Sequence, residues 1–247
     1  MAIRAQYESS NEVGVFARLT PTYCLLGQGG PEKFYQIFEA ELGGKMPIIR
    51  CTLGGQRIVG RITTGNSKGL LVPEDTSDQE MELLRSQLPE SVKLAKLPDR
   101  LSALGNCIAC NDSVALIHTD LDEASVEVIK ATLEVETFRA TIASMPLCGS
   151  YCVITNNGGM VHPRTSQADL EELAALLQLP LTAGTVNRGG ELIGAGIVAN
   201  DTTVFVGSDT TGTEIGVIEN IFRIQGCTAF SSTLAGMQST LMQTVPS

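Results

Sequence analysis

The sequence predicts an α/β fold, a closed fivefold pseudosymmetric propeller of ββαβ repeats, and two periodic features together predict it. Five glycines open apolar runs at intervals of 46, 45, 44 and 45 residues: Gly14, Gly60, Gly105, Gly149 and Gly194. Five apolar triplets with the spacing of one helix face start at the same intervals, at Tyr35, Met81, Val126, Leu170 and Ile215. Because two unrelated features drift in step, the chain is best explained as five copies of one unit.

Each unit is expected to contain two strands, a helix and a third strand, in that order. First strands are expected directly after each glycine, at 15–19, 61–65, 106–110, 150–155 and 195–199. Turns rich in Asn, Asp, Pro and Gly lead to second strands at 23–27, 69–73, 114–118, 159–163 and 203–207. In the helices, Ser77 and Glu80 have capping-box spacing, and Ser166 or Asp169 is a candidate cap. Third strands are expected at 46–53, 92–97, 137–142 and 181–186.

The fifth unit lacks a third strand of its own, and the N-terminal residues 2–7 are expected to supply it. Third strands start about 13 residues before the next glycine, and counting 13 back from Gly14 reaches Met1. This pairing would close the ring and remove exposed sheet edges. We therefore expect one domain over 1–224, with repeats at about 14–59, 60–104, 105–148, 149–193, and 194–224 plus 1–8. Residues 225–247 are expected to form a C-terminal tail.

Composition excludes several classes of function. No apolar run approaches the ~20 residues that span a bilayer, and the N-terminus lacks the apolar core of a secretory signal. Seven cysteines, an odd number, fit a reducing compartment better than a disulfide framework. The net charge of −10, with scattered Lys and Arg, does not fit binding to nucleic acid through phosphate neutralisation.

Two cysteine pairs have spacings that occur in metal and redox motifs. Cys107 and Cys110 are expected in the first strand of the third unit, where residues three apart point to opposite faces. We therefore interpret them as small core residues in preference to metal ligands or a redox pair, and Cys148 and Cys152 likewise. No metal and no cofactor is expected.

Two further motifs are assigned to structure. Gly194-Ala195-Gly196-x-x-Ala199 resembles a dinucleotide fingerprint, but here it is expected to open a strand and not a helix. His118 and His162 lie at matched positions after the second strands of neighbouring units. Without an evident catalytic partner, a strand-end role is favoured over general-base catalysis.

An enzymatic alternative stays open at this point. Fivefold α/β propellers include guanidine-modifying hydrolases and transferases with a Cys nucleophile near the C-terminus, an analogy at the level of the fold alone. Cys227 is the only late cysteine, the units are nearly equal in length, and no histidine lies within about 60 positions before it. The favoured expectation is therefore a protein without enzymatic activity.

Several long motifs, in order along the chain, resemble one family. They include SNEVGVFARLTPTYCL, GRITTGNSKGLLVP, RLSALGN, GSYC, GGMVHP and PLTAGTVNRG. From residue 1 to about Ile224 the chain is similar to the eukaryotic translation initiation factor 6 family, the ribosomal anti-association factors. The resemblance implies a pentein-type propeller that binds the joining face of the 60S ribosomal subunit, beside ribosomal proteins near the sarcin–ricin loop, and blocks the 40S subunit.

The resemblance also implies where and with what the protein works. It implies roles in 60S maturation and nuclear export, presence in cytoplasm, nucleus and nucleolus, and release by a translocase-like GTPase with a partner protein. We expect a monomer with no membrane partner. Carried over by motif, the ribosome-binding positions are Gly14, Arg61, Asn106 and Tyr151, all within two residues of a repeat glycine. The family's phosphorylated helix serines are replaced here by Ala174 and Ala175, so that switch is not expected.

Overall fold

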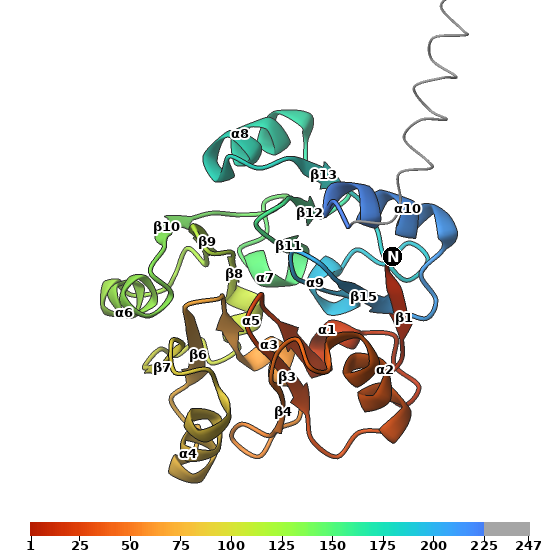
Figure 1. Cartoon of the computed structure of the whole chain (residues 1–247). Coiled ribbons are helices and arrows are strands. Elements are labelled where there is room, and N and C mark those ends of the chain that lie inside the picture. Colours follow the sequence, from red (N-terminus) through yellow and green to blue (C-terminus); the bar gives the residue numbers. More distant parts are fainter. Residues whose placement is uncertain (225–247) are drawn as a thin grey trace, which may run out of the picture.

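Five small sheets surround a common axis, and a long helix covers the outer side of each (Figure 1). The computed structural model describes residues 1–224; the predicted tail 225–247 lies outside the described residues. The sheets are β2–β3–β4 (Ala17–Leu19, Cys24–Gly27, Ile48–Cys51), β5–β6–β7 (Thr64–Gly65, Gly69–Pro73, Lys93–Leu97), β8–β9–β10 (Ile108–Cys110, Val114–Ile117, Glu136–Arg139), β11–β12–β13 (Cys152–Ile154, Gly159–Val161, Leu181–Ala183) and β14–β15–β1 (Ile197–Ala199, Val204–Gly207, Ile3–Ala5).

The outer helices connect the second strand of each unit to the third. They are α2 (Glu32–Leu42), α4 (Asp78–Gln87), α6 (Glu123–Leu133), α8 (Gln167–Leu177) and α10 (Gly212–Ile221). Within every sheet the first two strands are antiparallel and the third is parallel to the second. A tight turn can join only antiparallel strands, and the helix provides the crossover that a parallel pair requires. Among the described residues, no helix combines the length and apolar composition needed to cross a bilayer.

The N-terminal strand closes the ring, as the repeat spacing predicted. β1 pairs in parallel with β15, with Ile3 opposite Phe205 and Ala5 opposite Gly207. The backbone nitrogen of Ala2 also donates to Glu219 on α10. The first and last parts of the described chain therefore share one sheet, and the predicted fivefold ββαβ propeller is confirmed.

The start of each unit differs from the prediction. The repeat glycines lie inside single helical turns, and the first strands begin only after these turns. The turns are α1 (Val13–Phe16), α3 (Val59–Ile62), α5 (Leu104–Cys107), α7 (Cys148–Tyr151) and α9 (Ile193–Gly196). Backbone bonds such as Arg61 N to the Ile58 carbonyl and Asn106 N to the Ala103 carbonyl hold them. An apolar run of four or five residues does not distinguish a strand from a helical turn, because it covers little more than one helical period.

The hydrophobic core is divided into clusters that neighbouring units share. In one of them, Phe34 and Phe38 of α2 pack with Phe205 of β15, which belongs to the fifth unit. The rings of Phe38 and Phe205 stack with centroids 3.9 Å apart. A single unit cannot cover its own apolar surface, which is why repeat folds of this kind need their neighbours.

Asparagine side chains in the turns join several neighbouring units. Asn66 donates through Nδ2 to the carbonyl oxygen of Asn111, and Asn111 donates to that of Thr155. Across the closure of the ring, Asn200 donates to the carbonyl oxygen of Thr20. The Oδ1 atoms of these asparagines accept backbone N–H groups of their own turns. The turn residues thus fix the local turn and the contact between units together.

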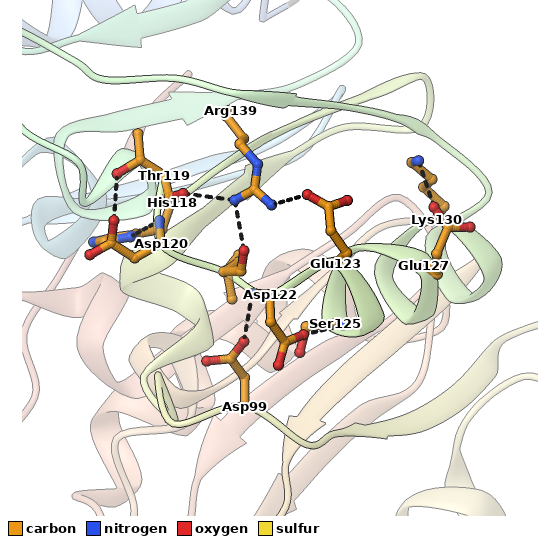
Figure 2. A network of polar contacts seen from close by, with 11 residues as sticks. Asp99, His118, Thr119, Asp120, Asp122, Glu123, Ser125, Glu127, Lys130 and Arg139 are labelled. Carbon is orange, nitrogen blue, oxygen red and sulfur yellow. Dashed lines mark hydrogen bonds and ion pairs between the residues drawn. The ribbon is translucent and has the colours of Figure 1, made fainter.

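The acidic run before α6 caps that helix (Figure 2). Asp122 accepts from Ser125 N at 2.6 Å, which satisfies an amide of the first turn. Arg139 of β10 donates to the carbonyl oxygens of Thr119 and Leu121 and to the Glu123 carboxylate. The carboxylates of Asp122 and Glu123 therefore serve the local fold, one as the helix cap and one as a partner of Arg139.

Candidate functional site

The five repeat glycines form a ring around the axis. The helical turns that carry them contact one another in the order α1, α3, α5, α7, α9 and back to α1. A Cβ atom added to Gly60 would collide with the carbonyl oxygen of Gly14, and one added to Gly14 with that of Gly194. Gly105, Gly149 and Gly194 meet the preceding glycine in the same way. The close approach of five backbones therefore requires glycine at each position.

The structure places Gly14 and Arg61, two of the predicted binding residues, in direct contact. Arg61 of α3 donates from Nε to the Gly14 carbonyl oxygen and from Nη1 to the Gly149 carbonyl oxygen, each at 3.0 Å. Its side chain lines a channel on the axis. Burial, followed by repulsion from Arg18, lowers the pKa of Arg61 to about 9, so that the group is still charged at neutral pH. This arginine ties units together and is not a freely solvated strand residue.

Arg18 was missed as a functional candidate. It lies in β2 between buried Ala17 and buried Leu19, and its guanidinium also lines the channel. Its Nη2 donates to the carbonyl oxygens of Gly60 at 2.9 Å and Thr63 at 2.6 Å. An arginine in the middle of a short apolar strand was the signal in the sequence, because a charge there needs specific partners.

Asn106 and Tyr151 lie on the same ring of turns but do not line the channel. Both side chains are half-buried, Asn106 on α5 and Tyr151 on the neighbouring α7. Among the described residues the Asn106 amide has no hydrogen bond to another side chain. Its donor and acceptor groups are therefore available to a partner molecule.

Tyr151 borders a surface depression of about 470 Å³. Its ring stands edge-on to the buried His162 ring, with centroids 5.3 Å apart. Glu191 lies 3.4 Å from Nε2 of His162 and also pairs with Arg164. Beside them Leu192 exposes 45% of its surface. The tyrosine is thus held by a packed neighbour and presents apolar area next to an exposed leucine.

Cys107 and Cys110 lie in separate environments, whereas Cys148 and Cys152 are both buried in one hydrophobic cluster. Cys107 is the last residue of α5, not a strand residue as predicted, and packs in the core of the third unit. Cys110, on β8, faces the axial channel, with Sγ near Thr64 Oγ1 and the Gly65 carbonyl oxygen. Burial raises the pKa of Cys107 to about 11 and those of Cys51 and Cys148 to about 12. The thiols of Cys24, Cys110 and Cys152 are shifted in the same direction by burial, so the described thiols are protonated at neutral pH.

The other two motifs have structural positions. Gly194 to Gly196 form a helical turn that precedes strand β14, whereas a dinucleotide fingerprint requires a strand before its helix. His118 and His162 each accept, through Nδ1, the backbone N–H two residues ahead, from Asp120 and Arg164. The matched histidines thus make the same local contact.

Comparison with known proteins identifies the family. The model of the eIF-6 family matches residues 2–221. The chain belongs to the eIF-6 family. Eukaryotic translation initiation factor 6 of Saccharomyces cerevisiae is 54% identical over 244 residues, 99% of each chain. Factor 6-2 of Arabidopsis thaliana is 55% identical over 99% of each chain, and factor 6 of Toxoplasma gondii is 57% identical over 91% of this chain and 85% of its own.

Solved structures of similar shape come from enzymes. A dimethylarginine dimethylaminohydrolase covers 70% of this chain and 68% of its own at 13% identity, with a TM-score of 0.45. ArgZ, an arginine dihydrolase of cyanobacteria, covers 70% of this chain and 28% of its own at 16% identity, with a TM-score of 0.48. Likeness at this level carries no argument about activity.

Proposed function

We propose that this protein binds the 60S ribosomal subunit at its joining face and sterically prevents association with the 40S subunit. The observation that carries the proposal is near-full-length identity of 54–55% to proteins named eukaryotic translation initiation factor 6. The closed ring supports it, because five units tied by shared cores and turn asparagines form a rigid body. The net charge of −10 would discourage the approach of 40S RNA.

We assign the binding rim to Gly14, Arg61, Asn106 and Tyr151, with divided roles. Asn106 offers an uncommitted amide, and Tyr151 offers flat apolar area with a polar tip, so these two contact the partner directly. Gly14 and Arg61 act on the partner indirectly, because both are engaged inside the ring. Their proposed role is to set the positions of the turns that carry the contact residues.

The wider proposal follows the family. The protein takes part in 60S biogenesis and nuclear export, in nucleus, nucleolus and cytoplasm, and acts as a monomer. A translocase-like GTPase and a partner protein release it from the subunit. The guanidine-modifying alternative is kept only as the second candidate, because no described thiol favours it: burial keeps all of them protonated at neutral pH.

A subunit-joining assay tests the proposal. Purified protein is added to 60S and 40S subunits, and the mixture is separated on a sucrose gradient. We expect the protein to sediment with 60S, the free-subunit peaks to grow and the 80S peak to shrink. An unchanged 80S peak at stoichiometric excess would refute the function. Turnover of an arginine-like substrate that iodoacetamide abolishes would instead favour the enzyme.

A further inference from the structure

The axial channel holds two positive charges and no carboxylate among the described residues that line it. Its lining comes from the first strands and the glycine turns, and its ionisable members are Arg18, Arg61, Cys110 and Cys152. The Cys110 and Cys152 thiols are uncharged at neutral pH, because burial raises the pKa of each. Arg18 and Arg61 repel each other, and the pKa values of both are lowered, chiefly by burial. Glu12, outside the channel lining, partly opposes the shift at Arg61.

The backbone holds both guanidinium groups in place but leaves one donor of Arg18 without a partner. Each donates to two carbonyl oxygens of other units, which fixes its orientation. Nε of Arg18 is shielded from solvent and has no acceptor in the described structure. A buried donor without a partner is costly, and a buried charge without a counter-charge more so. The site therefore has donors, charge and fixed geometry but lacks an acceptor.

The free space suits a small acceptor. The cavity between these residues measures about 50 Å³, room for roughly three or four water-sized groups. The acidic residues in the turns between the first and second strands already have hydrogen-bond partners. Asp112 accepts from Ser67 N and Asn156 Nδ2, and Asp201 accepts from Asn156. These carboxylates are committed to the ring of turns and do not neutralise the arginines.

We propose that the axial channel binds a small inorganic anion, of the size of chloride, between Arg18 and Arg61. The anion accepts from guanidinium N–H groups that the backbone leaves free, and its negative charge reduces the repulsion between the two arginines. Arg18 belongs to the first unit, Arg61 to the second, and their carbonyl acceptors to the first, second and fourth. A bound anion would therefore stabilise the contacts between these units, independently of what the rim binds.

Chloride NMR on the full-length protein tests the site. The wild type is expected to broaden the chloride resonance, and bromide is expected to reverse the broadening by competition. Arg18→Met should lose the effect. Arg100→Met removes the same charge from a side chain that is 75% exposed and should retain it. Broadening that is equal in wild type and Arg18→Met would overturn the proposal.

Crystals of the wild type grown in bromide provide a second measurement, which holds even if Arg18→Met fails to fold. An anomalous peak between the two guanidinium groups is the expected result. A channel with water density and no anomalous peak would overturn the anion site. Neither result depends on ribosome binding, so the two proposals fail separately.

Discussion

Nε of Arg61 lies 3.0 Å from the carbonyl oxygen of Gly14 and donates to it, so that two of the proposed rim residues are hydrogen-bonded to each other. Gly14 belongs to the first unit and Arg61 to the second, 47 positions later. The same guanidinium reaches across the axis to Gly149 in the fourth unit. Substitutions at Gly14 and Arg61 should therefore act on the ring itself, whereas substitutions at Asn106 and Tyr151 should act on the contact with a partner.

Gly14→Ala should destabilise the fold. The new Cβ would collide with the carbonyl oxygen of Gly194, and backbone atoms cannot move aside without opening the ring. We expect a loss of about 2–4 kcal/mol in the free energy of unfolding, measured by urea denaturation. Gly216→Ala, in the middle of α10 with open space around it, is the matched control and should gain about 0.5–1 kcal/mol. Equal stabilities of the two variants would contradict the glycine ring.

Arg61→Lys should destabilise the protein although it keeps the charge. A lysine ammonium cannot reproduce the planar fork that serves Gly14 and Gly149 together. We expect a loss of about 1–3 kcal/mol by urea denaturation. Arg164→Lys changes the same side chain where it is 76% exposed and should be nearly neutral. A neutral Arg61→Lys would show that the two hydrogen bonds contribute little.

Asn106→Ser should weaken binding to the 60S subunit and leave the fold intact. The shorter side chain loses the amide that the structure leaves uncommitted. A loss of about 1–2 kcal/mol, five- to thirtyfold in affinity, is expected in a co-sedimentation titration. Asn220→Ser, on the exposed outer surface of α10, should bind as the wild type does. If Asn106→Ser and Asn220→Ser bind equally well, Asn106 is not a contact residue.

Asp169→Glu should stabilise the protein by adding a contact that two other units already have, in which a helix glutamate accepts hydrogen bonds from the backbone of a nearby loop. Glu80 accepts from Gly54 N, Gly55 N and Ser77 N, at 2.9–3.2 Å. Glu214 binds the loop before α9 in the same way, through Arg188 N and Gly189 N. In the fourth unit the matching helix position is Asp169, whose backbone N bonds to Ser166 Oγ. Its side chain is one methylene shorter than that of glutamate.

The expected gain for Asp169→Glu is about 0.5–1.5 kcal/mol, visible as a rise in the thermal midpoint. The loop at Ala143 and Ser144, with φ of 50° and 66°, resembles the loop at Gly54 and Gly55, with φ of 56° and 70°. Glu80→Asp is the reciprocal variant and should lose a similar amount. A fall in the midpoint for Asp169→Glu would show that the fourth loop cannot accept the carboxylate.

Stability should fall in acid as Glu214 takes up a proton. Burial alone would raise the pKa of Glu214, but hydrogen bonds from Thr211, Gly189 and Thr185 outweigh it and lower the pKa to about 2. A depressed folded-state pKa gives stability that is complete above the ordinary value of 4.5 and is lost as the pH falls towards 2. Urea denaturation between pH 5 and about 2.5 should show this loss. Glu214→Gln should start less stable and show a shallower slope, and equal slopes would contradict the assignment.

The sequence predicted the architecture well because the repeat makes each feature appear five times. A glycine spacing or a helix triplet is weak evidence alone, but five of each in register left little freedom, even for the strand at residues 3–5 that closes the ring. Prediction failed where the apolar run was only about one helical turn long, which is too short to distinguish a helix from a strand by periodicity. The helical turn at Leu104–Cys107 was read as a strand, and Cys107 was misplaced with it.

The candidate site was only partly accessible from the sequence. Proximity to the repeat glycines placed Asn106 and Tyr151 on one ring of turns, because equivalent positions in a closed repeat lie at equivalent heights. Nothing local indicated that Arg61 points inward, and the position of Arg18 within an apolar strand indicated a need for partners without saying which they are. The acceptors of Arg61 are backbone carbonyls 47 and 88 positions away, and those of Arg18 are 42 and 45 positions away.

The sequence by itself therefore determined the fivefold repeat, the order of the strands and the long helix within each unit, and the closure by the N-terminal strand, since periodicity and hydrophobic pattern are properties of the chain. Only the tertiary structure decided which side chains face the axis. That choice depends on the approach of five backbones at the glycine ring, where each carbonyl oxygen lies where a neighbour's Cβ would be. The close packing of these backbones also forms the narrow axial channel and turns Arg18 and Arg61 towards it. As a result, Gly14 and Arg61 hold the ring together, whereas Asn106 and Tyr151 lie on its outer rim.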